Sequence, residues 1–521
     1  MSNRSKLSFV GLIATFILTT MAGGMAVSAE PDHAREAHVP NVYLAANFTV
    51  NYRGPGDNGT CDTSEDGALI AWPNDAKTAM NHVIDILDDL ITSSQTIVVD
   101  ACYQPHQQTS SLAYAGATDS YNVDNGMGQA VYAVALQNAI DNTDNNGASP
   151  EITTSTNSAI SWDYCTTNCS VDPAKFDFVS TLVHEFLHGL GFAMGFGVDN
   201  DNAPTVGNYP SPPTITDIFV YTSADYATNP NKQITSLPNN TAALLNIYNA
   251  GSGMVEFRGT NTLTANGFAP YIFSVANDWQ SGSSMSHLDD NHATNMGRMM
   301  NAATGSGPSS RTVDAITLMF LKDIGWTIAE ASDYGDTEFA AYGSAQHINT
   351  KTQVNSLWLG TDFSTENAAI RADTHDDGVT LQAWSDGADN GKVSLTVGSN
   401  TTNVKGCASI WIDWDGNDNF TDSADIAVAM MPVTNGSQDV MFTVPSGTFT
   451  GSGADKMFNA RVRLQPDWDR DGVCNDQVGM RYQYGIAGGE VEDYQWTLSN
   501  SGALITAPSV TPRAYLPILS K

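Results

Sequence analysis

The sequence predicts a multidomain protein in which an α+β domain is followed by an all-β antiparallel sandwich. Its 521 residues exceed what one ordinary hydrophobic core can serve. Up to residue 330, runs with helical spacing of apolar residues alternate with short strand-like runs, whereas beyond it apolar residues recur at every second position. We therefore expect one domain at 41–330 and a second at 331–498.

The elements expected in the first domain follow from these local patterns. β-branched and aromatic runs predict strands at 42–52 and 96–101, and apolar residues three and four apart predict helices at 74–91 and 129–140. The stretch 199–213 is dense in Asn, Asp, Gly and Pro, which indicates a loop or insertion.

The second domain shows a period of two. Apolar side chains alternate with polar ones in four short runs, at 379–383, 393–397, 440–444 and 460–464. Such runs are typical of strands with one buried face, and their number favours an antiparallel sandwich. The segment 499–521 is rich in Pro, Ser and Thr, so we expect a tail.

The N-terminus carries a targeting pattern. Basic residues within the first six positions, an apolar run at 7–21 and small residues at 27–29 predict a signal peptide over 1–29, followed by a short leader at 30–40. A retained membrane anchor is the alternative, but the apolar run is short for one. We expect a secreted, extracellular protein, or one held at the cell surface, with no transmembrane anchor in the mature chain.

Charge excludes one class of partner. The chain has 22 Lys and Arg against 56 Asp and Glu, a formal net charge of −34. Such a surface repels phosphate backbones, so no nucleic-acid partner is expected. Divalent cations are the more compatible ligands.

Six cysteines follow the predicted cleavage site, an even number that suits an oxidising compartment. Spacing leaves the connectivity open, and sequence neighbourhood favours three local bridges. They are Cys61 with Cys102, Cys165 with Cys169, and Cys407 with Cys474. A zinc-thiolate site at Cys165 and Cys169 is the alternative, although no second pair exists to complete it.

The segment 172–192 contains the pattern most informative about function. Asp172 is a suitable N-cap with Pro173 at the first helical position, and an apolar stripe follows. His184 and His188 lie one turn apart on the same side of this expected helix, and Glu185 lies beside them. This His-Glu-x-x-His spacing is the signature of zinc hydrolases.

A catalytic zinc ion takes three protein ligands and keeps one position open. In the extended pattern Gly191 fills the turn position, but Met194 stands where the last histidine belongs, so the third ligand comes from elsewhere. His287, within 282–290, is the best candidate. The alternatives are His292, Asp289 and Asp290.

These blocks resemble the leishmanolysin-like branch of the metzincin metallopeptidases, in which a long insertion precedes the third histidine and a Met-turn follows it. The matching blocks are 184–192, 286–288, Met300 and the expected helix 313–326. The sequence is also similar to secreted bacterial metalloproteases with a Gly-Ser-Ser-x-Ser-His-x-Asp segment. It departs from the family at Leu288, where Trp is common.

The resemblance covers about 41–330 and implies a zincin-type catalytic domain. It implies Zn²⁺ held by His184, His188 and His287, with Met300 in the Met-turn and Met299 as second choice. Three neutral imidazoles lower the pKa of zinc-bound water towards about 7, and Glu185 then acts as general base.

We therefore expect a secreted zinc metalloendopeptidase that acts on polypeptide substrates through a zinc-activated water. The rival hypothesis is a cell-surface adhesion or carbohydrate-binding protein with a vestigial metal site. The intact His-Glu-x-x-His pattern argues against such decay.

Three segments of the second domain, 333–336, 411–416 and 489–494, resemble a β-sandwich module named after its Gly-Glu-Val-Glu-Asp (GEVED) motif. This module is found appended to bacterial secreted proteins. The resemblance implies an accessory or adhesive domain for an extracellular surface or matrix ligand, and nothing in it suggests catalysis.

Two acidic loops in this domain are candidate Ca²⁺ sites, because alternate carboxylates followed by Gly can curl round a hard cation. Their candidate ligands are Asp413, Asp415 and Asn417 in the first loop, and Asp467, Asp469 and Asp471 in the second. Val478 occupies the twelfth position of the second loop, which excludes an EF-hand. Solvated Asp-Gly turns are an equally weighted alternative.

Overall fold

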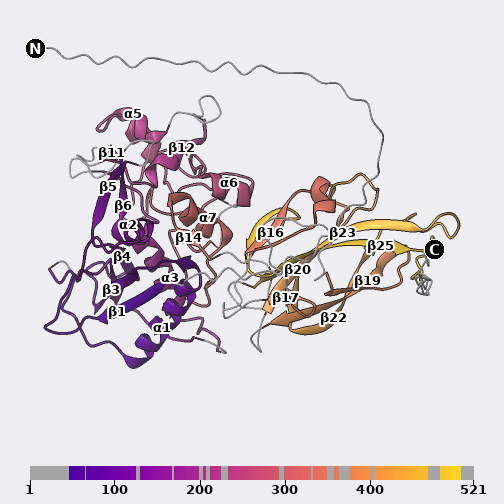
Figure 1. The fold of residues 1–521 in the computed structure, drawn as a ribbon, viewed down its shortest axis with the longest axis horizontal. Helices are drawn as coiled ribbons and strands as arrows, with labels where there is room; N and C mark the ends of the chain where they lie inside the picture. The colour runs from indigo at the N-terminus through magenta and orange to yellow at the C-terminus, as the bar shows by residue number, and fades with distance from the viewer. Residues whose placement is uncertain are drawn as a thin grey trace, which may run out of the picture. The chain divides into compact units, whose positions relative to one another are not determined.

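The computed structural model describes most of the chain between residues 46 and 505 (Figure 1). The described ranges are 46–64, 66–124, 129–166, 169–198, 204–206, 212–224, 233–292, 298–329, 332–348, 357–362, 376–399, 405–467, 474 and 481–505. The predicted signal peptide and leader, and residues 506–521 of the predicted tail, lie outside the described residues.

A four-stranded sheet in the order β1-β3-β7-β4 organises the first part of the chain. The first three strands are parallel, and β4 joins β7 in the antiparallel sense. The strands are β1 (Asn47–Tyr52), β3 (Thr96–Gln104), β7 (Ile152–Asn157) and β4 (Ala113–Ala117). The central strand β3 is buried along most of its length, as expected when both faces of a parallel strand are covered.

Helices α1 (Asn74–Asp88) and α3 (Phe178–Gly189) pack against each other, and α3 also packs against β4 and β7. Gly189 permits this approach, because a Cβ atom there would lie 2.5 Å from Cγ2 of Ile152 in β7. Helix α1 confirms the helix predicted at 74–91, but it ends three residues earlier than predicted, because Ile91 begins strand β2.

The helix predicted at 129–140 is only half correct. Residues Gln129–Ala133 form strand β6, which pairs with β5 (Ser120–Asp124), and helix α2 begins at Val134 and ends at Asp141. The run Gln-Ala-Val-Tyr-Ala contains a β-branched and an aromatic residue, which suit a strand, and pairing with β5 decides the choice.

Shorter elements complete this part of the chain. The paired strands are β2 (Ile91–Thr92) with β14 (Thr327–Ile328), β8 (Trp162–Asp163) with β9 (Phe176–Asp177), β10 (Phe196–Val198) with β11 (Pro204–Val206), and β12 (Val220–Thr222) with β13 (Val255–Phe257). The helices are α5 (Ala242–Tyr248), α6 (Thr260–Asn266) and α7 (Ala315–Ile324), with 3-10 turns η1 (Asp217–Phe219) and η2 (Ile234–Ser236).

The loop predicted at 199–213 is interrupted by a short strand. Residues 204–206 form β11 and pair with β10, whereas 199–203 and 207–211 lie outside the described residues. The backbone pairing of β11 with β10 forms a regular element that the Asn- and Pro-rich composition did not predict.

Two four-stranded antiparallel sheets dominate the second part, as predicted. One contains β17 (Leu357–Leu359), β18 (Val379–Leu381), β19 (Gly387–Ser399) and β22 (Gly436–Val444). The other contains β21 (Ile426–Thr434), β20 (Lys405–Ile412), β23 (Lys456–Pro466) and β25 (Glu490–Leu498). The alternating apolar residues of β19, β22 and β23 are buried in one hydrophobic cluster, which confirms the sandwich prediction.

A smaller sheet accompanies these two. It contains β15 (Ser332–Tyr334), β16 (Ala345–Ile348) and β24 (Tyr484–Ala487), and its β16–β24 pair is parallel. The 3-10 segment η3 (Thr337–Tyr342) lies between β15 and β16 in the sequence.

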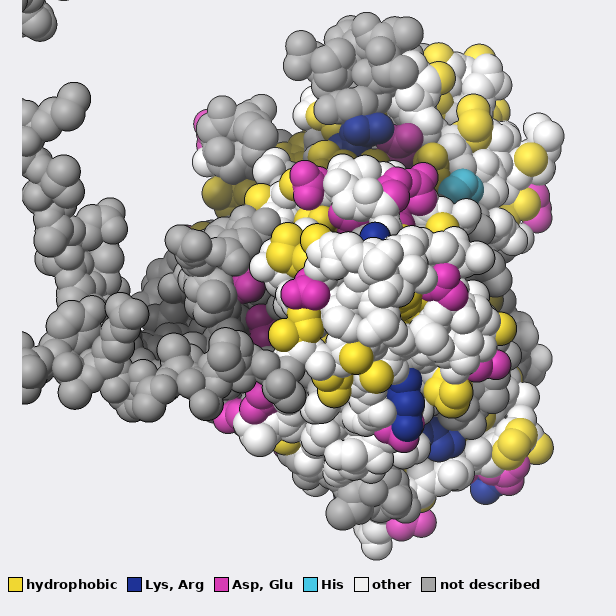
Figure 2. Space-filling view, turned by 90° about the vertical axis from the view of Figure 1, so that its right-hand side faces the viewer, with side chains coloured by type: hydrophobic (Ala, Val, Ile, Leu, Met, Phe, Trp, Pro, Cys, Tyr) yellow, Lys and Arg dark blue, Asp and Glu magenta, His cyan; other side chains and the backbone are white. Residues whose placement is uncertain are grey.

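The cysteines form the three local bridges that sequence neighbourhood favoured: Cys61–Cys102, Cys165–Cys169 and Cys407–Cys474. The zinc-thiolate alternative is therefore wrong, because both sulfur atoms of Cys165 and Cys169 are consumed in a disulfide. Acidic side chains are spread over the face drawn in Figure 2, with few Lys or Arg between them. No helix within the described ranges has the length and hydropathy of a membrane span.

Candidate metal centre

Helix α3 carries two of the predicted ligands, and Asp177 determines where it begins. The Oδ1 atom of Asp177 accepts hydrogen bonds from the backbone N–H groups of Val179 (3.1 Å) and Ser180 (3.4 Å). The predicted N-cap, Asp172, instead closes a separate turn by accepting from the N–H of Ala174. That prediction is wrong because Phe176 and Asp177 form β9, whose extended backbone delays the helix.

A buried ion pair ties this helix start to a distant segment. The guanidinium of Arg311 donates to both carboxylate oxygens of Asp177, at 2.8 and 2.7 Å, and to the carbonyl of Thr166 at 2.8 Å. Both charged side chains are buried. Asp177 thus caps α3 and anchors the segment that precedes α7.

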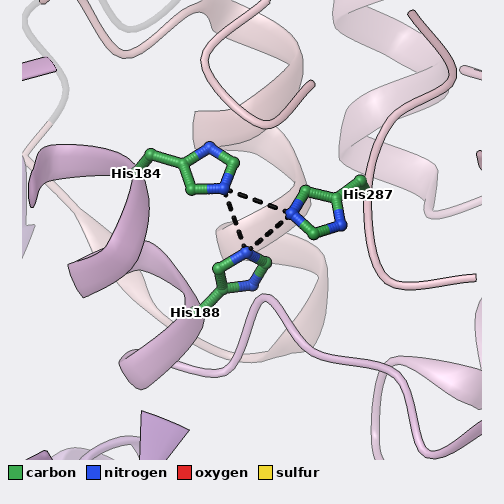
Figure 3. Close-up of side chains that lie close together, drawn as sticks. All are labelled: His184, His188 and His287. Carbon is green, nitrogen blue, oxygen red and sulfur yellow. Dashed lines mark hydrogen bonds between the residues drawn. The ribbon is translucent and has the colours of Figure 1, made fainter. Parts of the chain in front are cut away.

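The structure brings the three predicted histidine ligands together. The Nε2 atoms of His184 and His188 are 3.1 Å apart, and that of His287 lies 3.2 Å from the first and 3.1 Å from the second (Figure 3). His287 is buried, and the two helical histidines are half-buried. Three ring nitrogens from segments about 100 residues apart therefore face one point.

The other ring nitrogen of each histidine determines its protonation. Each Nδ1 atom lies at hydrogen-bond distance from a backbone carbonyl: His184 from Met299 (2.7 Å), His188 from Phe192 (2.7 Å) and His287 from Ser283 (3.1 Å). A carbonyl can only accept, so a proton on each Nδ1 satisfies all three of these bonds. The Nε2 atoms therefore direct bare lone pairs at one another.

This donor set fits zinc. Lone pairs at 3.1–3.2 Å repel unless a cation lies between them. Tetrahedral zinc with Zn–N of roughly 2.0–2.1 Å separates its nitrogen ligands by about 3.3 Å. A proton is a poor substitute, because burial lowers the pKa of His184, lowers that of His188 well below its usual value and lowers that of His287 to about 3.

The alternative third ligands are not brought to this point. The Oδ2 atom of Asp289 accepts from the Ser252 hydroxyl (2.6 Å) and the Gly253 N–H (2.9 Å), so this carboxylate secures a loop. The ring of His292 packs against Tyr271. Among the described residues, the three histidines are the only group of three or more His, Cys, Asp or Glu with ligand atoms close enough for one metal ion, so Asp290 is also outside it.

Glu185 is the residue predicted as the acid-base group beside the histidines. Its carboxyl is buried and takes a hydrogen bond from the backbone N–H of Ala115, in strand β4. Burial raises the pKa of Glu185 to about 8, and the Ala115 N–H opposes that rise. A cation at the histidines would also lower it. This carboxyl is therefore suited to exchange a proton near neutral pH.

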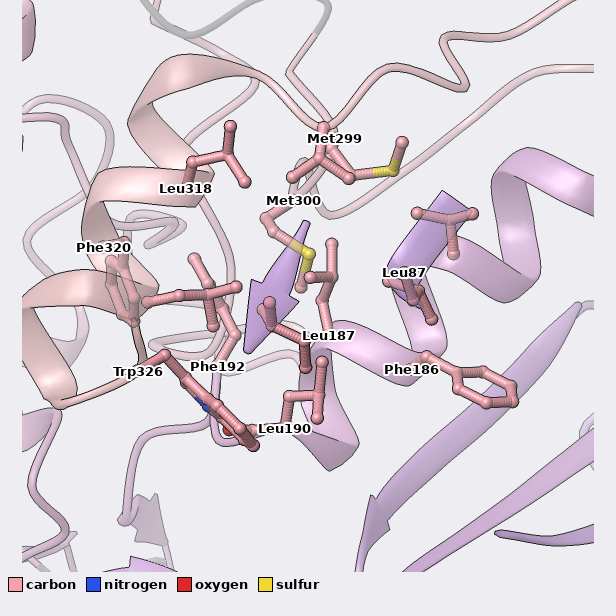
Figure 4. Close-up of a cluster of buried hydrophobic side chains, with 14 of the residues drawn as sticks. Leu87, Phe186, Leu187, Leu190, Phe192, Met299, Met300, Leu318, Phe320 and Trp326 are labelled. Carbon is pink, nitrogen blue, oxygen red and sulfur yellow. The ribbon is translucent and has the colours of Figure 1, made fainter. Parts of the chain in front are cut away.

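The predicted Met-turn lies in the core beside the histidine segments. Met300 is completely buried, and Figure 4 draws it with Met299 in the same cluster as Leu187 of α3 and Leu318 of α7. The backbone carbonyl of Met300 accepts from the N–H of Leu288 at 2.8 Å. Leu288, where the resemblance leads one to expect Trp, is itself fully buried.

Of the candidate calcium loops, the structure describes the first and part of the second. In the first, the oxygens of Asp413 accept the N–H groups of residues 416, 417 and 418, and the side chain of Asn417 bonds to that of Asp415. Asp467 is buried, whereas Asp469 and Asp471 lie outside the described residues. Calcium binding stays a hypothesis.

Comparison with known families gives a match within the second part of the chain. Residues 408–497 match the family model of the GEVED domain. Comparison with curated proteins and with solved structures gives no significant match. The resemblance that the motifs predicted is therefore confirmed for residues 408–497, which contain two of its three segments, 411–416 and 489–494.

The acidic residues of the GEVED motif have structural partners. Asp493 makes a two-pronged pair with the guanidinium of Arg461, at 2.7 and 2.8 Å. One oxygen of Glu492 accepts the backbone N–H groups of Asp377 (2.9 Å) and Gly378 (2.8 Å). Gly489 has a φ of +81°, and a Cβ there would collide with the carbonyl of residue 464, which accounts for the glycine.

Sequence patterns did not identify several residues that support the centre. Asp217 is completely buried and accepts the N–H groups of Gly195 (2.9 Å) and Thr214 (2.8 Å), which secures the chain that leaves α3. Burial raises the pKa of Asp217 to about 7. The apolar run from Phe178 could have indicated Asp177 as the cap, but no local signal pairs it with Arg311.

Proposed function

We propose that this chain is a secreted zinc-dependent metalloendopeptidase that hydrolyses peptide bonds. The observation that carries the proposal is the convergence of three histidine Nε2 atoms on one point. Each ring is oriented by a backbone carbonyl that bonds to its Nδ1 atom. Such second-partner bonds are typical of histidines that bind a metal. The three disulfides favour an oxidising, extracellular setting.

His184, His188 and His287 would hold the ion. Bound zinc supplies Lewis-acid polarisation of a carbonyl oxygen and acidifies water, leaving one position open for a substrate. The Glu185 carboxylate takes a proton from the attacking water and returns it to the leaving amine. Its burial and its bond to the Ala115 N–H keep it aimed at strand β4 rather than at bulk solvent.

Strand β4 favours a polypeptide substrate. Within the described sheet its only strand partner is β7, so its other edge is not paired with a strand, although the Ala115 N–H already bonds to Glu185. An extended peptide can add to such an edge through main-chain hydrogen bonds. A peptide laid along β4 would pass the Ala115 N–H and hence the Glu185 carboxyl.

The test combines metal content with hydrolysis of casein. Wild type is expected to bind one zinc ion per chain and to cleave casein until a chelator is added. Glu185→Gln should keep the zinc and lose about 10²–10⁴-fold in turnover, the usual share of general acid-base catalysis. Glu151→Gln is the matched control, because Glu151 is also buried but bonds to Val98 of β3 and to Asn138 of α2.

The same assay separates the rival hypothesis. An adhesion protein with a vestigial site would show no chelator-sensitive hydrolysis in wild type. Near-wild-type turnover by Glu185→Gln would refute the assignment of the general base.

A further inference from the structure

The turn at 298–301 contacts both histidine-bearing segments. The Met299 carbonyl accepts the Nδ1–H of His184 at 2.7 Å, and the Met300 carbonyl accepts the N–H of Leu288, next to His287, at 2.8 Å. Leu288 and Asn301 also form a parallel β-bridge. Any displacement of this turn therefore moves two ligands at once.

A single carboxylate from another segment holds this turn. The Oδ2 atom of Asp314 accepts the backbone N–H of Met299 at 3.0 Å. Its Oδ1 atom accepts the N–H of Thr317 at 3.2 Å and so caps helix α7, while the Thr317 hydroxyl donates to Oδ2 at 2.9 Å. The Arg298 guanidinium lies 3.9 Å from Oδ1. Asp314 is almost completely buried, so water does not compete for these bonds.

We infer that Asp314 is a positioning residue for the metal centre: through the backbone of Met299 it aims the His184 imidazole at the point shared with His188 and His287. One carboxylate oxygen holds the Met299 N–H, and the Met299 carbonyl in turn holds His184 Nδ1. This inference rests on the proposed function, because it assumes that the three histidines bind zinc. It adds that the rigid start of α7 supports the orientation of a ligand on α3.

The two oxygens of Asp314 allow its two roles to be separated. Serine is as good an N-cap as aspartate, so Asp314→Ser retains a cap for Thr317. Its single, shorter side-chain oxygen cannot also hold the Met299 N–H. Asp323→Ser is the matched control on the same helix, because the Asp323 carboxylate likewise accepts backbone N–H groups, those of Asn261 and Thr262, but not any in the turn.

The experiment measures zinc affinity by chelator competition and the visible spectrum of the cobalt-substituted protein. Loss of a group that orients a metal ligand typically lowers affinity about 10–100-fold. Asp314→Ser should show this loss and a changed cobalt spectrum, whereas Asp323→Ser should match wild type in both. Wild-type affinity and spectrum in Asp314→Ser would overturn the inference.

A measurement on the unmodified protein keeps the test decisive if Asp314→Ser does not fold. Coupling is reciprocal, so zinc bound at His184 must reduce the local opening of the backbone at Met299. Hydrogen exchange of the peptide that contains 298–301 should therefore slow on zinc addition, and an unchanged rate would overturn the inference. A wild-type protein that binds no zinc refutes the proposed function itself. If wild type binds zinc tightly and Asp314→Ser has the same zinc affinity and cobalt spectrum as wild type, only the role of Asp314 is refuted.

Discussion

Replacing His287 with alanine is the sharpest perturbation of the proposed centre. The substitution removes one of the three Nε2 donors and leaves the pair on α3 intact. The loop is expected to fold, because the Ser283 carbonyl that loses the imidazole partner still accepts the Ser286 hydroxyl at 3.1 Å. The loss should therefore appear in metal binding and not as general unfolding.

The expected magnitude follows from mass action. Free zinc at about 1,000 times its Kd stabilises the folded state by about 4.1 kcal/mol. In a domain of more than 200 residues, 1 kcal/mol shifts Tm by about 2–4 °C, so zinc should raise the wild-type Tm by about 8–16 °C. His287→Ala leaves only two imidazoles on one side of the ion and should lose most of this rise.

The assay is calorimetric or fluorescence melting with saturating zinc and with chelator, together with zinc content after dialysis. For each protein, the Tm with chelator is subtracted from the Tm with zinc. This difference does not contain the loss of stability caused by the cavity that the imidazole leaves, because the cavity is present in both conditions. His292→Ala is the matched control. His292 lies five residues after His287, and its ring packs against Tyr271 and lies outside the group formed by the three histidines of the centre. A full zinc-dependent rise in His287→Ala would refute the three-histidine centre.

Three further predictions follow from other contacts. Arg311→Met should lower the free energy of unfolding by about 3–5 kcal/mol because it leaves the buried Asp177 carboxylate unpaired; urea titration checks this, and an equal cost in Arg311→Met/Asp177→Asn would contradict the pairing argument. Burial raises the pKa of Glu492 from 4.5 to about 8. The folded state then retains a proton that the unfolded chain releases, so its contribution to stability is complete below pH 4.5 and declines as pH rises to about 8. Glu492→Gln should flatten this slope in urea titrations at several pH values, and an unchanged slope would locate its origin elsewhere. Calcium added to calcium-free, zinc-loaded protein should raise Tm if the loop containing Asp413 holds an ion, and an unaltered Tm excludes that site.

The sequence was most informative where function depends on local spacing. His184 and His188 are four residues apart, and a helix of period 3.6 must place them on one face, whatever surrounds it. Alternating apolar residues likewise required one buried face for strands such as β19 and β22. Both patterns needed nothing beyond the chain's own geometry.

The sequence was least informative where a long-range contact decides a local outcome. The run at 129–133 has a spacing compatible with helix or strand, and its pairing with β5 selects the strand. Asp172 was a plausible cap by type and position, but the extended β9 moved the helix start to Asp177. In each case the competing conformations are close in local free energy, so tertiary contacts select one.

The sequence by itself determined which residues are candidate donors, the period of elements such as α3 and β19, and the compartment that its cysteines suit. Only the tertiary structure decided that His287 meets the helical pair, that a backbone carbonyl faces Nδ1 of all three rings, and that Asp314 accepts the Met299 N–H. The reason is physical: local periodicity is set by backbone geometry within a few residues, whereas the convergence of side chains 103 positions apart is set by packing of the whole core.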